Sequence, residues 1–319
     1  MHPTRTLLLP LALFGLLGFV SGCGDGDESG TGGAAATSGA TTSTSGAGGG
    51  ASSSTSGSGG GGSQTVELAF EARVGDTPFS CAGSFPGLGL SGADADITDF
   101  RFYAHDFELH DSASGSWVPM TLVEDGLYQV ANLALLDFED KTGNCGNGTA
   151  ETNTVVRGVV PLGTYDGARF KLGVPFALNH ADVATAPSPL NLSGLFWNWQ
   201  GGYKFLRVDS VPVGGGSPFN VHIGSTGCDG DPSSGGVTSC DRENVTAVEL
   251  ADFDPATGVI VADYAALVAD NDLGTDGGGA PGCMAGVTDP ECGPIFSHLG
   301  LDITDGSESP ETLDFFHAE

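Results

Sequence analysis

The sequence predicts an all-β domain over residues 65–319, an antiparallel β-sandwich with long disulfide-stapled loops and one short helix. Three observations predict this class. Apolar and polar residues alternate strictly over residues 66–72, as in a strand with one buried face. Further short runs rich in β-branched and aromatic residues are bounded by Gly, Pro, Asn or Asp. Six cysteines in this region form an even set, which is typical of an exported, disulfide-stapled domain.

The predicted strands follow one another with no second linker and no internal repeat, so a single domain is expected. The further runs that predict strands are 155–160, 169–176, 203–208, 219–223 and 246–250. Over residues 100–109 the apolar positions alternate but slip by one residue at His105 and Asp106, which predicts a β-bulge. After a hairpin-like turn at residues 254–258, residues 264–269 are predicted to form the short helix.

The N-terminal part of the chain predicts export and anchoring. Residues 1–22 have a basic start, an apolar stretch over 7–20 and small residues at the end, as a bacterial signal peptide has. The sequence before Cys23 fits a lipobox, so we expect cleavage there and acylation of the Cys23 thiol; a plain secretory signal is the alternative. Residues 23–64 then form a tether that is almost entirely Gly, Ser, Thr and Ala and has too little to bury to fold. The expected location is the bacterial cell envelope, at the periplasmic face or the outer membrane.

Charge excludes several function classes. The chain has 40 Asp and Glu against 10 Lys and Arg, a formal net charge of −30. A surface that binds nucleic acid needs clustered basic residues to replace phosphate counterions, so nucleic acid is excluded as a partner. The same shortage excludes docking on anionic lipid through a basic patch and leaves the lipid on Cys23 as the membrane contact. The sequence has no GxSxG or HExxH motif, so we do not expect an enzyme.

With Cys23 assigned to the lipid, six cysteines remain, and an oxidising compartment favours disulfides between them. Six cysteines allow about fifteen pairings. Short spacing favours Cys228–Cys240 and Cys283–Cys292, with Cys81–Cys145 as the remainder. A cysteine metal cluster is the alternative, but no CxxC spacing occurs and thiolates would be oxidised in that compartment.

Few side chains remain that could carry chemistry, and the histidines come first. His105 lies at the predicted bulge, His180 is predicted to end a strand, and His222 lies within the run at 219–228. From spacing alone, a lone histidine on a strand is more often a hydrogen-bonded structural residue than a ligand. The histidines His110, His298 and His317 are interpreted as solvent-exposed or structural.

Two of the three tryptophans, Trp197 and Trp199, are separated by a single residue. On a strand they would point to the same face. Such a pair either fills a core or lines a site, and the physical chemistry favours neither reading over the other.

Four runs in fixed order resemble the MbnP-like proteins, also called the metallo-mystery-pair four-cysteine-motif family. The runs are LNHADVATAPSPLN (178–191), FWNWQGGYKF (196–205), FNVHIGSTGC (219–228) and GCMAGVTDPEC (282–292). The segments DFRFYAHDFEL (99–109) and GTYDGARFKLGVPFALNH (163–180) also fit, so the resemblance covers nearly the whole of residues 65–319. The six cysteines after the anchor depart from the four in the family's name.

The resemblance implies an exported copper-binding protein encoded beside a di-haem enzyme of the MauG and cytochrome c peroxidase type. In related copper proteins that enzyme oxidises a tryptophan near the metal to kynurenine. The resemblance assigns the copper-ligand role to His180 and His222, with His105 as a further candidate, and the modification to Trp197 or Trp199. Imidazole nitrogen is a suitable ligand for copper.

Other assignments stay open beside this one. Met284 could offer a thioether to Cu(I), although its place next to Cys283 favours packing. The acidic loop at 270–276 has oxygen ligands at alternating positions but lacks the closing Glu of a calcium loop. The bases Arg169, Lys171, Lys204 and Arg207 are expected to pair with carboxylates. The alternative function is a non-catalytic cell-surface binding module that contacts carbohydrate or protein through its aromatic segment.

Overall fold

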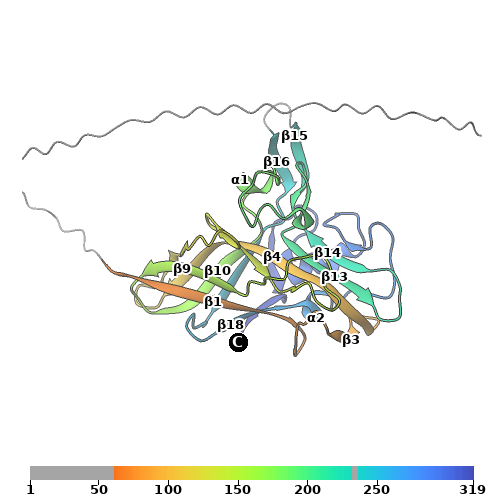
Figure 1. The fold of residues 1–319 in the computed structure, drawn as a ribbon, viewed down its shortest axis with the longest axis horizontal. Coiled ribbons are helices and arrows are strands. Elements are labelled where there is room, and N and C mark those ends of the chain that lie inside the picture. Colours follow the sequence, from red (N-terminus) through yellow and green to blue (C-terminus); the bar gives the residue numbers. More distant parts are fainter. Residues whose placement is uncertain (1–60, 232–235) are drawn as a thin grey trace, which may run out of the picture. The chain divides into compact units, whose positions relative to one another are not determined.

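The computed structural model describes residues 61–231 and 236–319, with the backbone alone at 310–312 (Figure 1). The predicted signal peptide, the predicted acylation site Cys23 and nearly all of the predicted tether lie outside the described residues. None of the helices in the described part is long and apolar enough to cross a membrane.

The described chain forms two large sheets and three small ones. The six-stranded sheet A has the order β22-β18-β1-β9-β6, with β2 paired to β1. Its strands are β1 (Ser63–Val74), β2 (Thr77–Pro78), β6 (Thr121–Leu122), β9 (Val155–Pro161), β18 (Val259–Asp263) and β22 (Phe316–Ala318).

The ten-stranded sheet B has the order β17-β10-β4-β13-β14-β19, and β3, β5 and β8 also pair with the long strand β4, with β7 paired to β8. Its strands are β3 (Ser84–Leu88), β4 (Ala93–Asp111), β5 (Ser116–Pro119), β7 (Gln129–Val130), β8 (Leu133–Asp137), β10 (Tyr165–Leu172), β13 (Leu206–Pro212), β14 (Phe219–Ile223), β17 (Thr246–Ala251) and β19 (Gly282–Cys283).

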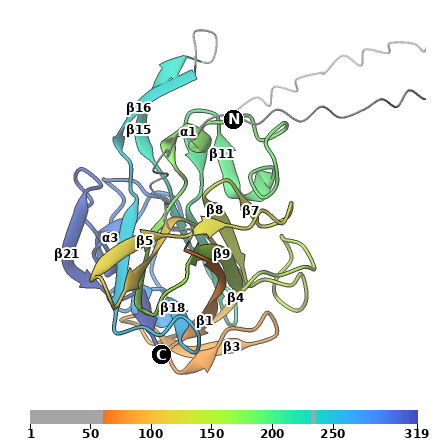
Figure 2. The same cartoon turned by 90° about the vertical axis from the view of Figure 1, so that its left-hand side faces the viewer.

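Three hairpins and four short helical elements complete the domain. The hairpins are β11 (Phe196–Asn198) with β12 (Gly202–Tyr203), β15 (Thr226–Asp231) with β16 (Gly236–Arg242), and β20 (Leu299–Leu301) with β21 (Glu308–Leu313). The helical elements are α1 (Phe176–Asn179), the 3-10 turn η1 (Ser193–Leu195), α2 (Tyr264–Leu267) and α3 (Cys292–His298). Figures 1 and 2 both place α1 and the β15–β16 hairpin at the same end of the domain.

The main core lies between sheets A and B. The side chains of Phe70 on β1, Phe102 on β4 and Phe170 on β10 are buried there, and the Phe70 ring meets the other two edge to face at centroid distances of 6.1 and 5.5 Å. Edge-to-face pairs of this kind add to the free energy gained from burial. The expected β-sandwich is therefore confirmed, and β1 shows the alternation of buried and exposed residues that predicted it.

The sandwich is not purely antiparallel, however. Strand β18 is parallel to β1, and β19 is parallel to β14. The turn at residues 254–258 was expected to resemble a hairpin, but it carries the chain from β17 in sheet B to β18 in sheet A. Because the chain crosses between sheets there, the strands before and after the turn are not partners, and β18 can enter sheet A parallel to β1.

Local features of the sequence explain most elements. Asp106 has a positive φ of 54°, and the register between β4 and β10 shifts at this point, so the predicted bulge is present. The helix predicted at 264–269 is α2, where the Asp263 carboxylate accepts a hydrogen bond from the backbone N–H of Ala265. The prediction of a single helix was wrong, since α1 and α3 are helices too.

The six cysteines form three disulfides in the pairing that spacing favours. They are Cys81–Cys145, Cys228–Cys240 and Cys283–Cys292. Disulfides persist in oxidising compartments, so the three bonds indicate an exported protein.

The outer face of sheet B, turned away from sheet A, is covered by the segment at residues 174–205. A second hydrophobic cluster forms under this cover and includes Tyr103 of β4 and Tyr203 of β12. The Tyr103 hydroxyl donates to the Pro189 carbonyl at 2.9 Å, and the Tyr203 hydroxyl donates to the Leu190 carbonyl. These bonds fix the segment that carries His180 and both candidate tryptophans against sheet B.

Candidate metal site

His180 lies at the C-terminal end of helix α1, where its backbone N–H bonds to the Leu178 carbonyl. The expectation that it ends a strand was wrong. Strand β10 stops at Leu172, and Pro175, which has no N–H for a strand ladder, precedes α1 and accepts hydrogen bonds from Leu178 and Asn179 through its carbonyl. The turn of helix places the His180 ring between the Phe176 ring, the backbone of Trp199 and the Cys228–Cys240 disulfide.

Hydrogen bonds fix the protonation of the His180 ring. Nδ1 lies 3.1 Å from the carbonyl oxygen of Trp199. Because a carbonyl only accepts, Nδ1 carries the proton and Nε2 holds the lone pair. Nε2 lies 3.3 Å from the side-chain nitrogen Nδ2 of Asn179 and 3.5 Å from Sγ of Cys240. Burial lowers the pKa of His180, which favours the neutral form that binds metals.

The sequence predicted that Trp199 and Trp197 share a strand face, and this prediction was wrong. Strand β11 ends at Asn198, whose side-chain oxygen accepts hydrogen bonds from the backbone N–H groups of Gln200 and Gly201 at 2.9 and 2.7 Å. Such an asparagine stabilises a turn. Trp199 therefore lies in the turn between β11 and β12, and its carbonyl is directed at His180.

Trp197 is half-buried and packs against the start of the segment that follows β14. A Cβ atom added at Gly224 would lie 2.7 Å from Cζ3 of the Trp197 indole, so a residue with a side chain does not fit there without a shift. Gly224 lies two residues after His222, and Ser225 accepts a hydrogen bond from Asn179, the neighbour of His180, at 3.1 Å. The end of β14 thus connects the surroundings of Trp197, His180 and His222.

His222 lies on β14, with its side chain buried on the face opposite to Phe219 and Ile223, which belong to the main core. Its Nε2 is 2.5 Å from Oδ1 of Asp209 on the neighbouring strand β13. Burial lowers the pKa of His222 although the Asp209 carboxylate acts in the opposite direction. A neutral His222 donates from Nε2 to this carboxylate, which leaves the lone pair on Nδ1.

His222 and Asp209 belong to a buried group of charges on the outer face of sheet B. Arg207 donates to Asp209 and lies 3.1 Å from the Asp99 carboxylate, which also pairs with Arg101. Burial alone would raise the pKa of Asp209, but its bonds to His222 and Arg207 outweigh burial and hold the pKa below its usual value.

Two further carboxylates, Asp137 and Glu139, are buried beside Arg101. Burial raises the pKa of both, and that of Asp137 reaches about 7 despite the nearby guanidinium of Arg101. Within the described residues, Oδ2 of Asp137 and Oε1 of Glu139 have no hydrogen-bond partner. Ionising Asp137 in the folded protein is therefore costly.

The substitution Asp137→Asn is expected to flatten the pH dependence of stability. The folded protein keeps the Asp137 proton up to about pH 7, whereas the unfolded chain loses it near pH 4, so the folded state is disfavoured as the pH rises through this window. Relative to the wild type, the free energy of unfolding of the variant should rise from no gain at pH 4 to a gain of up to about 4 kcal/mol at pH 8. Urea unfolding at both pH values measures it. The exposed Glu67→Gln is the control, and an equal gain at both pH values would contradict the assignment.

His105 is buried on β4 at the bulge and is 5% exposed. Its Nδ1 lies 3.2 Å from the Asp106 carboxylate, but within the described residues neither ring nitrogen makes a hydrogen bond. Burial lowers the pKa of His105. Buried polar atoms are rarely left unpaired, so this histidine is unusual among those described.

The three candidate histidines do not form one compact ligand set. In the described part of the chain, the only group of three or more His, Cys, Asp or Glu residues whose ligand atoms lie within 4.8 Å of one another is His180, Cys228 and Cys240. The two sulfurs of that group are joined in a disulfide. His222 and His180 are connected through Asn179 and the end of β14, while His105 lies at the bulge of β4.

The other sequence candidates have structural partners. His298 bonds to Asp270 and Asp314, each at 3.2 Å, and Oδ1 of Asp272, in the acidic loop considered for calcium, accepts from the backbone N–H of Gly274. Met284 lines a cavity of about 620 Å³ beside Trp197. The bonds of Asp270 to His298 and of Asp272 to Gly274 account for the loop at 270–276 as a hydrogen-bonded turn.

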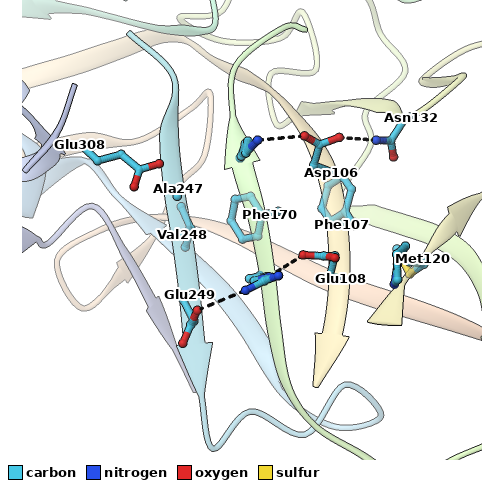
Figure 3. A pocket seen from close by; sticks show the side chains of 13 residues that line it. Asp106, Phe107, Glu108, Met120, Asn132, Phe170, Ala247, Val248, Glu249 and Glu308 are labelled. Carbon is cyan, nitrogen blue, oxygen red and sulfur yellow. Dashed lines mark hydrogen bonds and ion pairs between the residues drawn. The ribbon is translucent and has the colours of Figure 1, made fainter. Parts of the chain in front are cut away.

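The basic residues pair largely as expected. Arg169 contacts Glu108 at 2.5 Å, and Lys171 contacts Asp106 at 3.1 Å. These pairs line a pocket of about 550 Å³ on sheet B, where Asp106 also accepts from Asn132 (Figure 3). Lys204 is the exception, because its ammonium donates to the Gly194 carbonyl at 3.1 Å. Glu249 also lies 3.9 Å from Arg169, so both bases of this pocket are already paired with carboxylates, and we assign it no ligand.

Asn179 is the residue of the site that sequence reasoning missed. It is buried, donates to the Ser225 hydroxyl, and accepts from the backbone N–H of Tyr203 at 2.8 Å. A Cβ atom added at Gly202 would lie 2.4 Å from its side-chain oxygen, so the two positions constrain each other. Asn179 thereby holds α1, β12 and the end of β14 together. Only its place next to His180 could have suggested this.

The fold and the site define a class: a disulfide-stapled β-sandwich whose outer face carries two buried or half-buried histidines, each bonded through one ring nitrogen to an oxygen acceptor. The family model described as MbnP matches residues 63–285 of this chain. The solved structure "MbnP from Methylosinus trichosporium" is 30% identical and has a TM-score of 0.72, covering 81% of this chain and 98% of that one. The chain therefore belongs to the MbnP family, as its motifs indicated. No curated protein sequence matches it.

Proposed function

We propose that this protein is an exported copper-binding lipoprotein and the partner and substrate of a di-haem enzyme of the MauG and cytochrome c peroxidase type. The observation that carries the proposal is the hydrogen bond from His180 Nδ1 to the carbonyl of Trp199, at 3.1 Å. This bond joins a candidate ligand to the backbone of a residue whose side chain is a candidate for modification.

The donor set fits copper. Histidines that bind metals usually donate their second ring N–H to a carboxylate or a backbone carbonyl. His222 makes the first kind of bond, to Asp209, and His180 the second kind, to Trp199. Burial favours the neutral form of both rings, and neutral nitrogen ligands suit copper. His105, whose buried ring nitrogens lack hydrogen-bond partners among the described residues, is the further candidate.

Oxidation of a tryptophan would add a ligand of a different kind. The indole nitrogen is a donor only, whereas the aromatic amine of kynurenine has a usable lone pair. The sequence contains no CxxCH motif for a covalently attached haem, so the oxidant has to come from a partner. Trp197 and Trp199 are both half-buried, and both remain candidates.

Analysis of the protein purified from its native envelope tests this proposal. We expect one bound copper ion, the mass of kynurenine in the peptide covering residues 195–205, and an N-terminal peptide that begins with acylated Cys23. Protein made in a host without the neighbouring di-haem enzyme is the control, in which both indoles should stay intact. Native protein without copper and with both tryptophans unmodified would contradict the proposal and favour the binding-module alternative.

A further inference from the structure

The disulfide Cys228–Cys240 lies directly beside the lone pair of His180. Cys228 on β15 and Cys240 on β16 are opposite each other in the antiparallel hairpin. Sγ of Cys240 is 3.5 Å from Nε2 of His180, and the ligand atoms of all three residues lie within 4.8 Å of one another. Three soft or borderline donors thus surround one point at the end of the domain where α1 meets the hairpin (Figure 2).

In the oxidised protein this group cannot hold a metal through sulfur, because the thiolate is the form of cysteine that binds metals. His180 is nevertheless already oriented. Its bond to the Trp199 carbonyl keeps the proton on Nδ1 and the lone pair on Nε2, the nitrogen nearest to Cys240. What separates this group from a three-ligand site is the bond between the two sulfurs.

We propose that reduction of Cys228–Cys240 converts this group into a second metal site, in which two thiolates and His180 Nε2 bind Cu(I). The disulfide takes two electrons and two protons from a dithiol reductant, which itself becomes a disulfide. When Cu(I) binds, the two thiols release their protons to solvent. Soft thiolate ligands select Cu(I), and an imidazole completes the set. The site uses neither His222 nor a modified tryptophan, so it goes beyond the copper site proposed above. It shares Nε2 of His180 with that site, so one chain can fill only one of the two sites at a time.

The hairpin would hold the two thiols together after reduction. Backbone pairing continues on both sides of the cysteines, at Thr226 with Arg242 and at Asp229 with Ser239. Arg242 also donates from Nε to the Thr226 hydroxyl at 2.9 Å. Metal–sulfur bonds of about 2.3 Å separate two thiolates by about 4 Å, a distance that opposed residues of a hairpin can span without breaking the ladder.

Of the three disulfides, this one is the most open to a reductant. Cys240 is half-buried and Cys228 is 8% exposed, whereas the other four cysteines are at most 3% exposed. Within the described residues, no other disulfide belongs to a group of three close metal-binding side chains. Mild treatment should therefore release two thiols and leave the other bonds closed.

The test compares Cu(I) affinity before and after mild reduction of the folded protein by dithiothreitol, which is then removed without oxygen. Thiol counting should give two thiols per chain. Competition with a chromophoric Cu(I) chelator should then show affinity at least about 100-fold above that of the oxidised protein, because thiolates replace weaker ligands. A sulfur-to-copper charge-transfer band in the near ultraviolet should appear with the metal.

Variants assign the ligands. Cys228→Ser with Cys240→Ser should abolish the gain on reduction, and His180→Ala, which keeps both thiols and the hairpin, should reduce it by about 10-fold or more. His110→Ala, at a half-buried histidine that bonds to Asp166, is the control and should keep the full gain. His222→Ala should keep it too, while weakening copper binding by the oxidised protein, so the two sites can fail separately. Reduced protein that binds Cu(I) no better than the oxidised form, or a gain that survives in the double serine variant, would overturn the proposal.

Discussion

Replacing His180 and His222 together by alanine is expected to abolish stoichiometric copper binding by the disulfide-intact protein. Each ring offers one nitrogen to a metal, and in each the other nitrogen is held by an oxygen acceptor, Trp199 O in one case and Asp209 in the other. Loss of both rings removes the two main candidate nitrogen ligands. The affinity for copper should fall by at least about 100-fold, which chelator competition or equilibrium dialysis can measure.

The fold should survive this change. His222→Ala leaves Asp209 paired with Arg207, which donates to it through two nitrogens, so that no carboxylate becomes an unpaired buried charge. His180→Ala leaves in place the bond that Asn179 donates to Ser225 and the bond that it accepts from Tyr203. Near-ultraviolet circular dichroism should therefore match that of the wild type. His298→Ala is a control for losing a histidine that is bonded on both sides, and it should retain copper.

A folded double variant that binds one copper ion with undiminished affinity would place the site elsewhere. Addition of His105→Ala would then show whether the histidine at the bulge holds the metal. Its ring nitrogens are buried without a hydrogen bond in the described part of the chain, so it is the next nitrogen ligand to consider.

Much of the sandwich could be predicted because its signals are local. The alternation in β1 reports one buried face, and the slip at Asp106 reports a bulge, where φ is 54°. Two of the disulfides followed from spacing, because joining cysteines 9 and 12 residues apart closes short loops at a small entropy cost. In each of these cases neighbouring residues decide the structure.

The arrangement of the site could not be predicted, because it depends on one local turn that interrupts the alternation and on contacts distant in sequence. The turn at Trp199 is set by the Asn198 side chain, which overrides the alternation that would have aligned the two tryptophans. The parallel entry of β18 depends on how the chain crosses between sheets. The contact of His180 with Cys240 joins residues 60 positions apart, and no periodicity predicts such a pair.

Replacement of the two tryptophans one at a time should show which indole is oxidised, and that modification should tighten copper binding. After exposure to the neighbouring di-haem enzyme and peroxide, we expect the mass of kynurenine in the wild type and in only one of Trp197→Phe and Trp199→Phe. The variant that lacks the modification should retain the copper affinity of untreated protein, because two imidazoles without the aromatic amine leave the ligand set incomplete.

The surroundings of the two indoles make the comparison informative. Phenylalanine at 199 leaves the backbone carbonyl that holds His180 in place, so the histidine ligand should keep its orientation. Phenylalanine at 197 lacks the Cζ3 and Cη2 atoms that approach Gly224 but keeps an aromatic ring beside the cavity of about 620 Å³, which offers space for an opened ring. A loss of modification in either variant then reports the absence of the indole and not a disturbed site. If both tryptophans of folded wild-type protein stay intact under these conditions, this protein is not a substrate of the di-haem enzyme. The double alanine variant would then test a copper site built from histidines alone.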